Sequence, residues 1–469
     1  MSFIDDAGAP PLQTVQFKDN ITAQLLRLAI DHKLFHNDVK WDNIKYDKTR
    51  NRAVLLDFGW ATSTTSGFPF FGPMHLPIVV GHRSDVVHLC ALATPTGAPK
   101  PDDPPQTVWL YSLDQRGSVH EHCRRPTGWD SRDLTRELQL EPARTLACTV
   151  VEGCKTLYLA GRDGRLYELA LGKPGDPRPR GAVHIGGAVR LHAASEVVCA
   201  TRPTDAGGQQ PPTLLVFVDG DGRLHALERQ RGPECGPAQW ESDSTDLDPP
   251  PVMGSGYRIA AGLENSGKLS VFYVGEGGQL CRVTWRGRGM WRIARLSTPH
   301  GVPQSLAVAF PSQIGHRGAA HVFYTTDAGD LWEARTEGLA AKWGIFPHTR
   351  LSQASIHNLS CWAGAPLIAG PLPRSRAEGG GCAGAAVVAV ICGPGLEGGF
   401  LRRFFTGGGL LEGAADTDWH EQELTEGRPH LRSAPLAEAG RGAALCALAS
   451  AGGAHHVFYA AQGGAIVEL

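Results

Sequence analysis

The sequence lacks the features that mark several large classes of protein. Its 45 basic and 47 acidic residues give a formal net charge of −2, so bulk attraction to nucleic acid or to an anionic membrane is not expected. No apolar run is long enough to cross a bilayer. The first residues, Met1–Asp6, show no basic region followed by an apolar segment, so we expect no signal peptide.

Cysteine is present, but without the spacing of a metal site. The chain has 11 cysteines, an odd number, and they are scattered. Several lie within apolar, strand-like runs, namely Cys90, Cys148, Cys199 and Cys446. We therefore expect buried free thiols in a reducing compartment, which favours a cytoplasmic location.

Turn-forming residues are abundant, and stretches with helical spacing are rare. The chain has 58 glycines and 33 prolines in 469 residues. Such a composition is typical of a turn-rich all-β protein. The chain is too long for one ordinary hydrophobic core, so it contains several domains or a repeat fold.

Comparison of the chain with itself reveals one recurring unit. The unit has an apolar first strand, a second strand that ends in Phe or Tyr, a Gly/Asp-rich turn and a third strand. The second strand, turn and third strand recur at residues 108–121, 157–168, 215–226, 271–280, 322–333, 387–404 and 457–468. The first-strand segment Leu89–Ala93 returns letter for letter at Leu445–Ala449.

Five units carry a tryptophan shortly after the third strand, where a fourth, outer strand would begin. These are Trp129, Trp240, Trp291, Trp343 and Trp419. A four-stranded unit cannot bury both faces alone, so the units pack around an axis. The sequence therefore predicts an all-β protein, a β-propeller of about seven four-stranded blades, with six as the alternative. The last unit stops after its third strand, and we expect Ile78–Val80 to complete it.

At these residues the chain, over about 78–469 of a predicted propeller domain of residues 76–469, resembles the fungal fucose-specific lectins, which are β-propellers. The shared outline is an aromatic second strand, an Asn/Asp-Gly turn, a third strand that ends in Glu, and a following Trp. The resemblance implies binding of carbohydrate, fucose-type glycans or glycoproteins, between neighbouring blades. Carried onto this chain, it marks the candidate sugar-binding residues Glu121, Trp129, Glu168, Glu333 and Trp343.

The chain departs from the lectin pattern at one position. The family carries an Arg twelve residues before the Glu, and here those positions hold Trp109, Thr156, His321 and His456. A charge-assisted donor to the sugar is therefore absent from its usual place. The segment Asp219–Arg223 is faintly similar to a calcium loop, but it lies where every other unit has a hairpin turn, and we expect a turn.

The first 75 residues differ from the rest and predict a short α+β fragment. Residues 20–34 have the apolar spacing of a helix. His36–Asn43, followed by the Tyr46–Asn51 hairpin and Asp57-Phe58-Gly59, resembles the catalytic loop and magnesium-binding motif of protein kinases. The resemblance implies that Asp38 accepts the substrate proton, Lys40 steadies the phosphate, and Asn43 and Asp57 hold magnesium.

Most of a kinase is missing from this chain. Only about 35 residues precede the catalytic loop, and the Gly-rich loop, the strand Lys and the hinge that build the nucleotide pocket are not found. We therefore expect residues 1–75 to be a truncated kinase-like fragment without activity. Mg-ATP would be a cofactor only if this fragment were active. The alternative function is a pseudokinase-like protein whose propeller face is a protein–protein scaffold; no nucleic-acid or membrane partner is expected.

Overall fold

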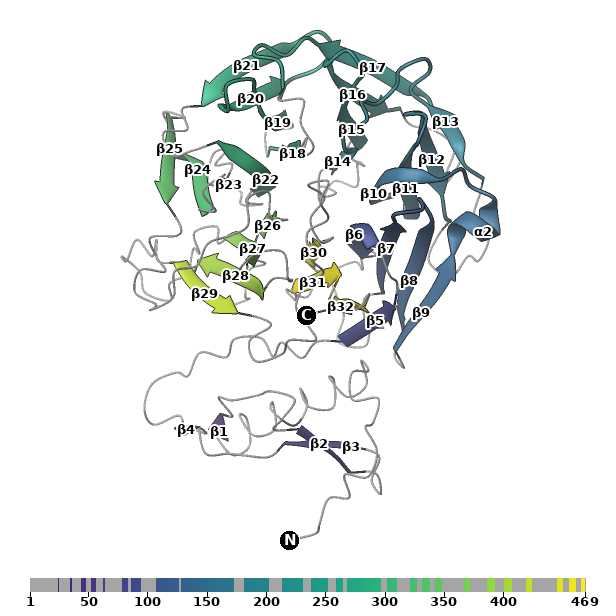
Figure 1. Ribbon diagram of the computed structural model, residues 1–469, viewed down its shortest axis with the longest axis vertical. Coiled ribbons are helices and arrows are strands. Elements are labelled where there is room, and N and C mark those ends of the chain that lie inside the picture. Colours follow the sequence, from purple (N-terminus) through teal and green to yellow (C-terminus); the bar gives the residue numbers. More distant parts are fainter. Residues whose placement is uncertain are drawn as a thin grey trace.

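The computed structural model describes the continuous ranges 107–125, 128–172, 181–201, 213–230, 238–251, 259–264, 268–296 and 302–309, together with Gln24 and the strands named below. Within them, seven four-stranded antiparallel sheets are arranged around a common centre (Figure 1). Among the described residues, the short α2 (Leu134–Leu138) is the one helix whose first and last residues are assigned. The predicted all-β propeller is therefore confirmed as the fold class.

Six of the sheets contain strands in sequence order from the centre outward. The first four sheets are β6 (Val86–Ala93), β7 (Val108–Asp114), β8 (Val119–Arg125), β9 (Gly128–Asp133); β10 (Ala143–Val151), β11 (Cys154–Gly161), β12 (Leu166–Ala170), β13 (Val183–Ile185); β14 (Val198–Thr201), β15 (Thr213–Val218), β16 (Leu224–Arg229), β17 (Trp240–Thr245); and β18 (Ala260–Leu263), β19 (Leu269–Val274), β20 (Leu280–Trp285), β21 (Trp291–Leu296). The next two are β22 (Pro303–Ala309), β23 (His321–Thr326), β24 (Leu331–Glu337), β25 (Lys342–Pro347); and β26 (Leu367–Pro371), β27 (Ala386–Cys392), β28 (Phe400–Thr406), β29 (Trp419–Glu423).

The last sheet joins the two ends of the propeller sequence. It contains β30 (Leu445–Ala449), β31 (His455–Ala460) and β32 (Ala465–Glu468), and its outer strand is β5 (Ile78–His82). β5 pairs antiparallel with β32, with Ile78 opposite Glu468 and His82 opposite Ala465. The expected completion of the last unit by Ile78–Val80 is thus confirmed. The two identical first-strand segments, in β6 and β30, lie on neighbouring innermost strands.

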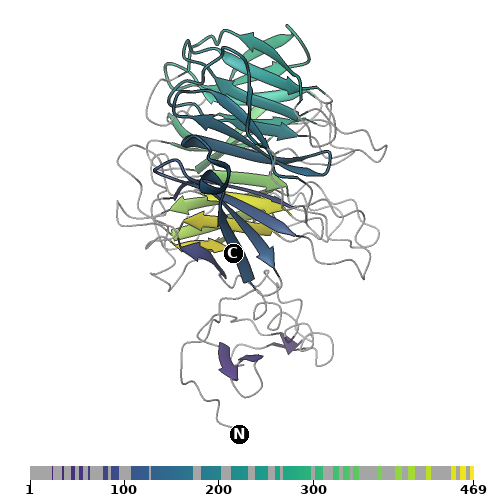
Figure 2. The ribbon, with the colours of Figure 1, turned by 90° about the vertical axis from the view of Figure 1, so that its right-hand side faces the viewer.

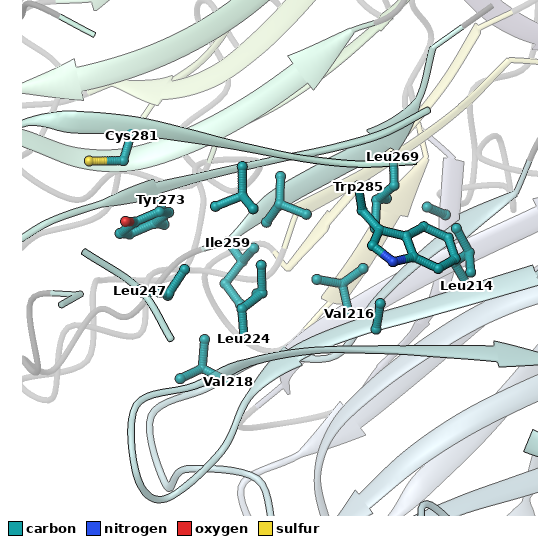
Figure 3. Packing of buried hydrophobic residues seen from close by; sticks show 14 residues of the cluster. Leu214, Val216, Val218, Leu224, Leu247, Ile259, Leu269, Tyr273, Cys281 and Trp285 are labelled. Atoms are coloured by element: carbon teal, nitrogen blue, oxygen red, sulfur yellow. The ribbon is translucent and has the colours of Figure 1, made fainter. Parts of the chain in front are cut away.

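The hydrophobic core lies between the blades. The largest fully buried side chains are aromatic residues of second strands, among them Tyr111, Tyr158, Phe217, Phe272 and Phe458. Buried clusters combine residues of adjacent sheets; one of them, drawn in Figure 3, joins β15 and β16 to β19 and β20. Period-two alternation places apolar side chains on both faces of each blade, so each blade covers its neighbours.

The tryptophans that follow the third strands begin the outer strands, as predicted. Trp240, Trp291 and Trp419 are the first residues of β17, β21 and β29, and Trp129 and Trp343 are the second residues of β9 and β25. An indole at the start of an outer strand lies at the edge of the blade, next to the preceding blade. This position decides which carboxylates the tryptophans meet.

The short strands of the N-terminal region lie outside the ring of sheets (Figure 2). β1 (Leu34–Phe35) pairs with β4 (Thr62–Ser63), and β2 (Ile44–Asp47) pairs with β3 (Arg52–Leu55). The β2–β3 pair confirms the predicted hairpin around Tyr46–Asn51. The kinase-like residues Asp38, Lys40, Asn43 and Asp57 lie outside the described residues, so their roles stay predictions.

The cysteines differ from the expectation at one position. Six described cysteines are free thiols, namely Cys90, Cys123, Cys148, Cys199, Cys281 and Cys446. Cys154 is disulfide-bonded, so the expectation of free thiols is wrong there. Burial raises the pKa of the Cys199 and Cys446 thiols, which keeps them protonated and unreactive. The cytoplasmic location stays a prediction. Within the described part of the chain, no helix is long and apolar enough to cross a membrane.

Candidate carbohydrate-binding sites between the blades

Four third strands carry a buried glutamate opposite the aromatic residue of the second strand. The pairs are Tyr111 and Glu121, Tyr158 and Glu168, Phe323 and Glu333, and Phe458 and Glu468. The glutamates are at most 4% exposed. A buried carboxylate is costly unless it is paired and hydrogen-bonded, so the partners of each glutamate show how its site is built.

Glu168 lies at the boundary between blade β10–β13 and blade β14–β17, which we call the Glu168 seam. Arg229 Nε of β16 donates to Glu168 Oε1 at 3.0 Å, and Trp240 Nε1 of β17 donates to Glu168 Oε2 at 3.0 Å. Both donors come from the following blade. The Trp240 ring also packs edge-on against Tyr158, with centroids 5.6 Å apart. A carboxylate, a guanidinium and an indole therefore meet between two blades.

Glu468 lies at the corresponding boundary between blade β30–β32/β5 and blade β6–β9, which we call the Glu468 seam. Trp129 Nε1 donates to Glu468 Oε2 at 3.2 Å, and Arg124 Nη1 lies 3.7 Å from Glu468 Oε1. His456 Nδ1 lies 2.8 Å from the same Oε1. The Trp129 ring packs edge-on against Phe458 at 5.8 Å. Trp129 and Arg124 have the same positions in their blade as Trp240 and Arg229 in theirs.

Glu121 has a different set of partners. It accepts hydrogen bonds from the Tyr111 hydroxyl at 2.9 Å, from Arg132 Nε at 2.8 Å and from Lys155 Nζ at 2.9 Å. Lys155 belongs to β11 of the following blade, and its Nζ lies 4.9 Å from the centroid of the Trp109 ring. Burial and the adjacent Glu121 carboxylate raise the pKa of Tyr111, so its hydroxyl remains a donor. The Glu121 carboxylate is fully engaged by the protein.

The position of the missing lectin arginine is partly filled by histidine. His321 Nδ1 hydrogen-bonds Glu333 Oε1, and His456 Nδ1 hydrogen-bonds Glu468 Oε1. Each histidine lies twelve residues before its glutamate, and its ring is stacked on the phenylalanine of the same strand, Phe323 or Phe458. In these two blades an imidazole therefore contacts the carboxylate from the place where the family has a guanidinium.

The structure combines the predicted residues differently from their order in the repeat. Trp129 follows Glu121 in the sequence, but it donates to Glu468 of the preceding blade. Glu168 likewise meets the tryptophan of another blade, Trp240 of the following one. The side chain of Trp343 lies outside the described residues, so its relation to Glu333 is not described. The sequence reasoning missed Arg124, Arg229 and Glu468 as members of the sites. Shifting each Glu against the Trp of the next unit would have found both seams.

Other blades lack this carboxylate. At the equivalent third-strand position, opposite Val216 and Phe272, blade β14–β17 has Ala226 and blade β18–β21 has Arg282. Arg282 forms an ion pair with Glu264 of its own blade. The glutamate sites are thus a property of particular boundaries and not of the whole ring.

No metal site accompanies these clusters in the described residues. The segment Asp219–Arg223 is a hairpin turn, as predicted. Asp219 Oδ1 accepts from the backbone N–H groups of Asp221 and Arg223, and Asp219 Oδ2 lies 2.7 Å from His225 Nε2. These partners leave the carboxylate occupied by its own turn.

No protein-family model and no curated protein matches this chain. Solved structures similar to it include AofleA from Arthrobotrys oligospora, with 13% identity over 74% of this chain and 92% of that chain and a TM-score of 0.46. The Aleuria aurantia lectin, described as a six-bladed β-propeller with a novel fucose recognition mode, has 13% identity over 73% and 96% and a TM-score of 0.45. The WD40 domain of SCAP from fission yeast has 11% identity over 82% and 87% and a TM-score of 0.47. Likenesses this distant assign no function, and those named here give no support to the kinase-like fragment.

Proposed function

We propose that this chain is a carbohydrate-binding, lectin-like β-propeller whose ligand sites lie at seams between blades. The observation that carries the proposal is the repeated meeting of a glutamate with an arginine and a tryptophan of the next blade, at the Glu168 seam and at the Glu468 seam. Guanidinium and indole N–H groups donate to sugar oxygens, and an aromatic ring covers the apolar face of a sugar.

The Glu468 seam is the more favourable of the two. Arg124 is 19% exposed, and its Nε is a buried donor without a hydrogen-bond partner in the described part of the chain. A buried donor without an acceptor costs free energy, and a sugar hydroxyl entering beside Trp129 would supply the acceptor. The Trp129 side chain is half-buried, so part of its ring remains open to a ligand.

The buried glutamates fit the role of positioning groups in this proposal. Glu168 already accepts hydrogen bonds from Trp240 and Arg229, and Glu468 accepts one from Trp129 and forms an ion pair with Arg124, so the indole and the arginine are oriented at both seams. Glu121, which is engaged by Tyr111, Arg132 and Lys155, and Glu333, which hydrogen-bonds His321, are likewise proposed to position the groups around them. Trp129 is then the predicted sugar contact that faces the ligand, and Trp343 stays a predicted contact of its own seam. Because the repeat resembles fucose-specific lectins, fucosylated glycans are the first ligands to test.

The test is a glycan array probed with the full chain and with Trp129→Phe and Trp240→Phe. Phenylalanine retains an aromatic ring but removes the indole donor and part of the stacking surface. We expect binding to a defined neutral glycan that falls about tenfold or more in at least one variant, as the loss of one good contact predicts. Trp291→Phe is the matched control, because Trp291 opens an outer strand whose preceding blade has Ala226 in place of Glu.

A protein–protein scaffold is the second candidate function. The observation that favours it is that the buried carboxylates already have hydrogen-bond and ion-pair partners within the protein. The same clusters can therefore serve to hold neighbouring blades together. Absence of binding to every glycan on the array, with Trp129→Phe and Trp240→Phe lowering only the unfolding temperature, would reject the lectin proposal in favour of this one. The kinase-like residues Asp38, Lys40, Asn43 and Asp57 remain a prediction of an inactive fragment within that alternative.

A further inference from the structure

An exposed, purely basic hairpin lies on blade β18–β21, away from the glutamate seams. The segment Trp285–Leu296 contains Arg286, Arg288, Arg292 and Arg295, all exposed, and no acidic residue. The whole stretch Gly277–Thr326 has six arginines and neither aspartate nor glutamate. In a chain of net charge −2, this is a local concentration of positive charge. We call residues 285–296 the arginine hairpin.

The tip of the arginine hairpin is held in place. Arg286 N–H donates to the Met290 carbonyl at 3.2 Å, and Met290 N–H donates to the Gly287 carbonyl at 2.9 Å. Asp243 of the neighbouring blade also holds the tip, because its Oδ2 accepts from Gly289 N–H at 2.7 Å and from Trp285 Nε1 at 2.9 Å. The arginines therefore project from a defined hairpin, which lowers the ordering cost of binding.

Among the residues that the structure describes, one of the four arginines of the hairpin has an acidic partner. Arg295 pairs with Asp248 at 3.1 Å. Arg286, Arg288 and Arg292 have no acidic partner among the residues that the structure describes. Their charges are available to a ligand.

The corresponding hairpin of blade β6–β9 is different. There Arg125 pairs at 3.2 Å with Asp130 of its own outer strand, and the same strand also carries Asp133. The comparison shows that an arginine after the third strand does not by itself produce a basic surface. The outer strand must also lack carboxylates, as β21 does.

The third strand of blade β18–β21 has changed sign as well. It carries Arg282 where four other blades carry glutamate. No carboxylate of that strand therefore opposes the arginine hairpin, and Glu264, the partner of Arg282, is 7% exposed. The third strand therefore adds an arginine, and no carboxylate, to this edge of the blade.

We propose that the arginine hairpin binds a sulfated glycan chain. Guanidinium groups recognise sulfate oxygens with paired, charge-assisted hydrogen bonds, and arginines on a short basic segment are typical of surfaces that bind polyanionic sugars. One hairpin with four arginines matches a short sulfated segment, whereas a duplex nucleic acid needs neutralisation of many phosphates along a broad face. This site is separate from the Glu168 and Glu468 seams. It rests on the proposed function in one respect, namely that the anion bound is a glycan.

The test measures binding of the full chain to a heparin oligosaccharide by biolayer interferometry at several salt concentrations. The hairpin variant is Arg286→Ala/Arg288→Ala/Arg292→Ala. The matched control is Arg125→Ala/Arg165→Ala/Arg223→Ala, which removes the same charge from three exposed arginines that pair with surface aspartates. We expect binding that weakens with salt, about tenfold or greater loss in the hairpin variant, and a change below about twofold in the control.

Two results would overturn the proposal. Equal losses in both triple variants would show that bulk charge and not the hairpin binds the oligosaccharide. Tighter binding of the wild type to a DNA duplex or to anionic vesicles than to heparin, or no binding to heparin, would exclude the sulfated-glycan class. The neutral-glycan array distinguishes this failure from failure of the seam proposal, because the hairpin variant retains Trp129 and Trp240.

Discussion

Two neighbouring boundaries of the same ring are closed by different physical means. At the Glu168 seam, a buried carboxylate is tied to Arg229 and Trp240 of the next blade. At the following boundary, between blade β14–β17 and blade β18–β21, the equivalent position is Ala226, and a large apolar cluster fills the space (Figure 3). We call this boundary the apolar seam. One repeat can therefore be stabilised either by a polar cluster built on a buried glutamate, or by a largely apolar cluster.

The difference has a functional meaning. A buried ion pair is a weak source of net stability compared with apolar packing of similar volume. A polar seam between blades therefore fits the proposed role in ligand binding better than a role in stability alone. The apolar seam has Ala226 in place of the buried glutamate, and Trp291 at its outer edge serves as the natural control for the tryptophans of the glutamate seams.

The largest effect is expected when one partner of the Glu168 seam is removed. Glu168→Ala leaves the Arg229 guanidinium, 5% exposed, without its charged partner on β12. The free energy of unfolding should fall by about 3 to 5 kcal/mol, measured by urea denaturation. Glu241→Ala, an exposed position on β17, should change it by less than about 0.5 kcal/mol. If Glu168→Ala lowered the free energy of unfolding as little as Glu241→Ala does, the ion pair would not stabilise the seam.

A somewhat smaller effect is expected from a cavity in the apolar seam. Leu224 is fully buried in the cluster of Figure 3. Leu224→Ala should lower the free energy of unfolding by about 3 kcal/mol, and this loss should not depend on salt, because no charge is involved. Met290→Ala, at 56% exposure, is the control. A salt-dependent loss at Leu224 would show that the two seams are not stabilised in different ways.

The smallest effect concerns pH and the outer edge of the apolar seam. Burial raises the pKa of Asp243, but hydrogen bonds from Gly289 N–H and the Trp285 indole outweigh it and hold that pKa below the ordinary 3.8. A depressed carboxylate pKa contributes stability above the unfolded value and loses it as pH falls through the folded value. Asp243→Asn should cost about 1 kcal/mol at neutral pH.

Asp243→Asn should also weaken the dependence of the free energy of unfolding on pH in the acid range. Thermal unfolding at pH values above and below 3.8 measures both quantities. Asp130→Asn, at an exposed aspartate of β9, is the matched control and should change the free energy of unfolding at neutral pH by less than about 0.5 kcal/mol. If the free energy of unfolding of Asp243→Asn depended on acid pH as strongly as that of the wild type, the assignment of a lowered pKa to Asp243 would be wrong.

Much of the fold could be read from the sequence because its signals are local. Alternation of apolar residues, aromatic ends of second strands and Gly/Asp turns predict strands within a few residues. The turn at Asp219–Arg223, the outer-strand position of Trp240 and even the closing strand Ile78–Val80 were found in this way. Each depends on short segments whose geometry the backbone and a few neighbours determine.

The candidate sites could be predicted only in part. The glutamates were found from the repeat, but Trp129 was read beside Glu121, whereas it meets Glu468, which lies 339 residues away in the chain. Lys155 was not found at all, although it contacts Glu121. A contact between blades has no fixed spacing within one repeat, so sequence periodicity does not show it.

The sequence by itself determined the repeat, the strand pattern and the positions of the carboxylates, because those follow from side-chain periodicity along each strand. Only the tertiary structure decided which donor meets which carboxylate. Closure of the ring brings the third strand of one blade against the third and fourth strands of the next, and burial there requires every charge to find a partner. The absence of acidic residues among the arginines of residues 285–296 is visible in the sequence, but only the structure shows that all four arginines are exposed on one hairpin.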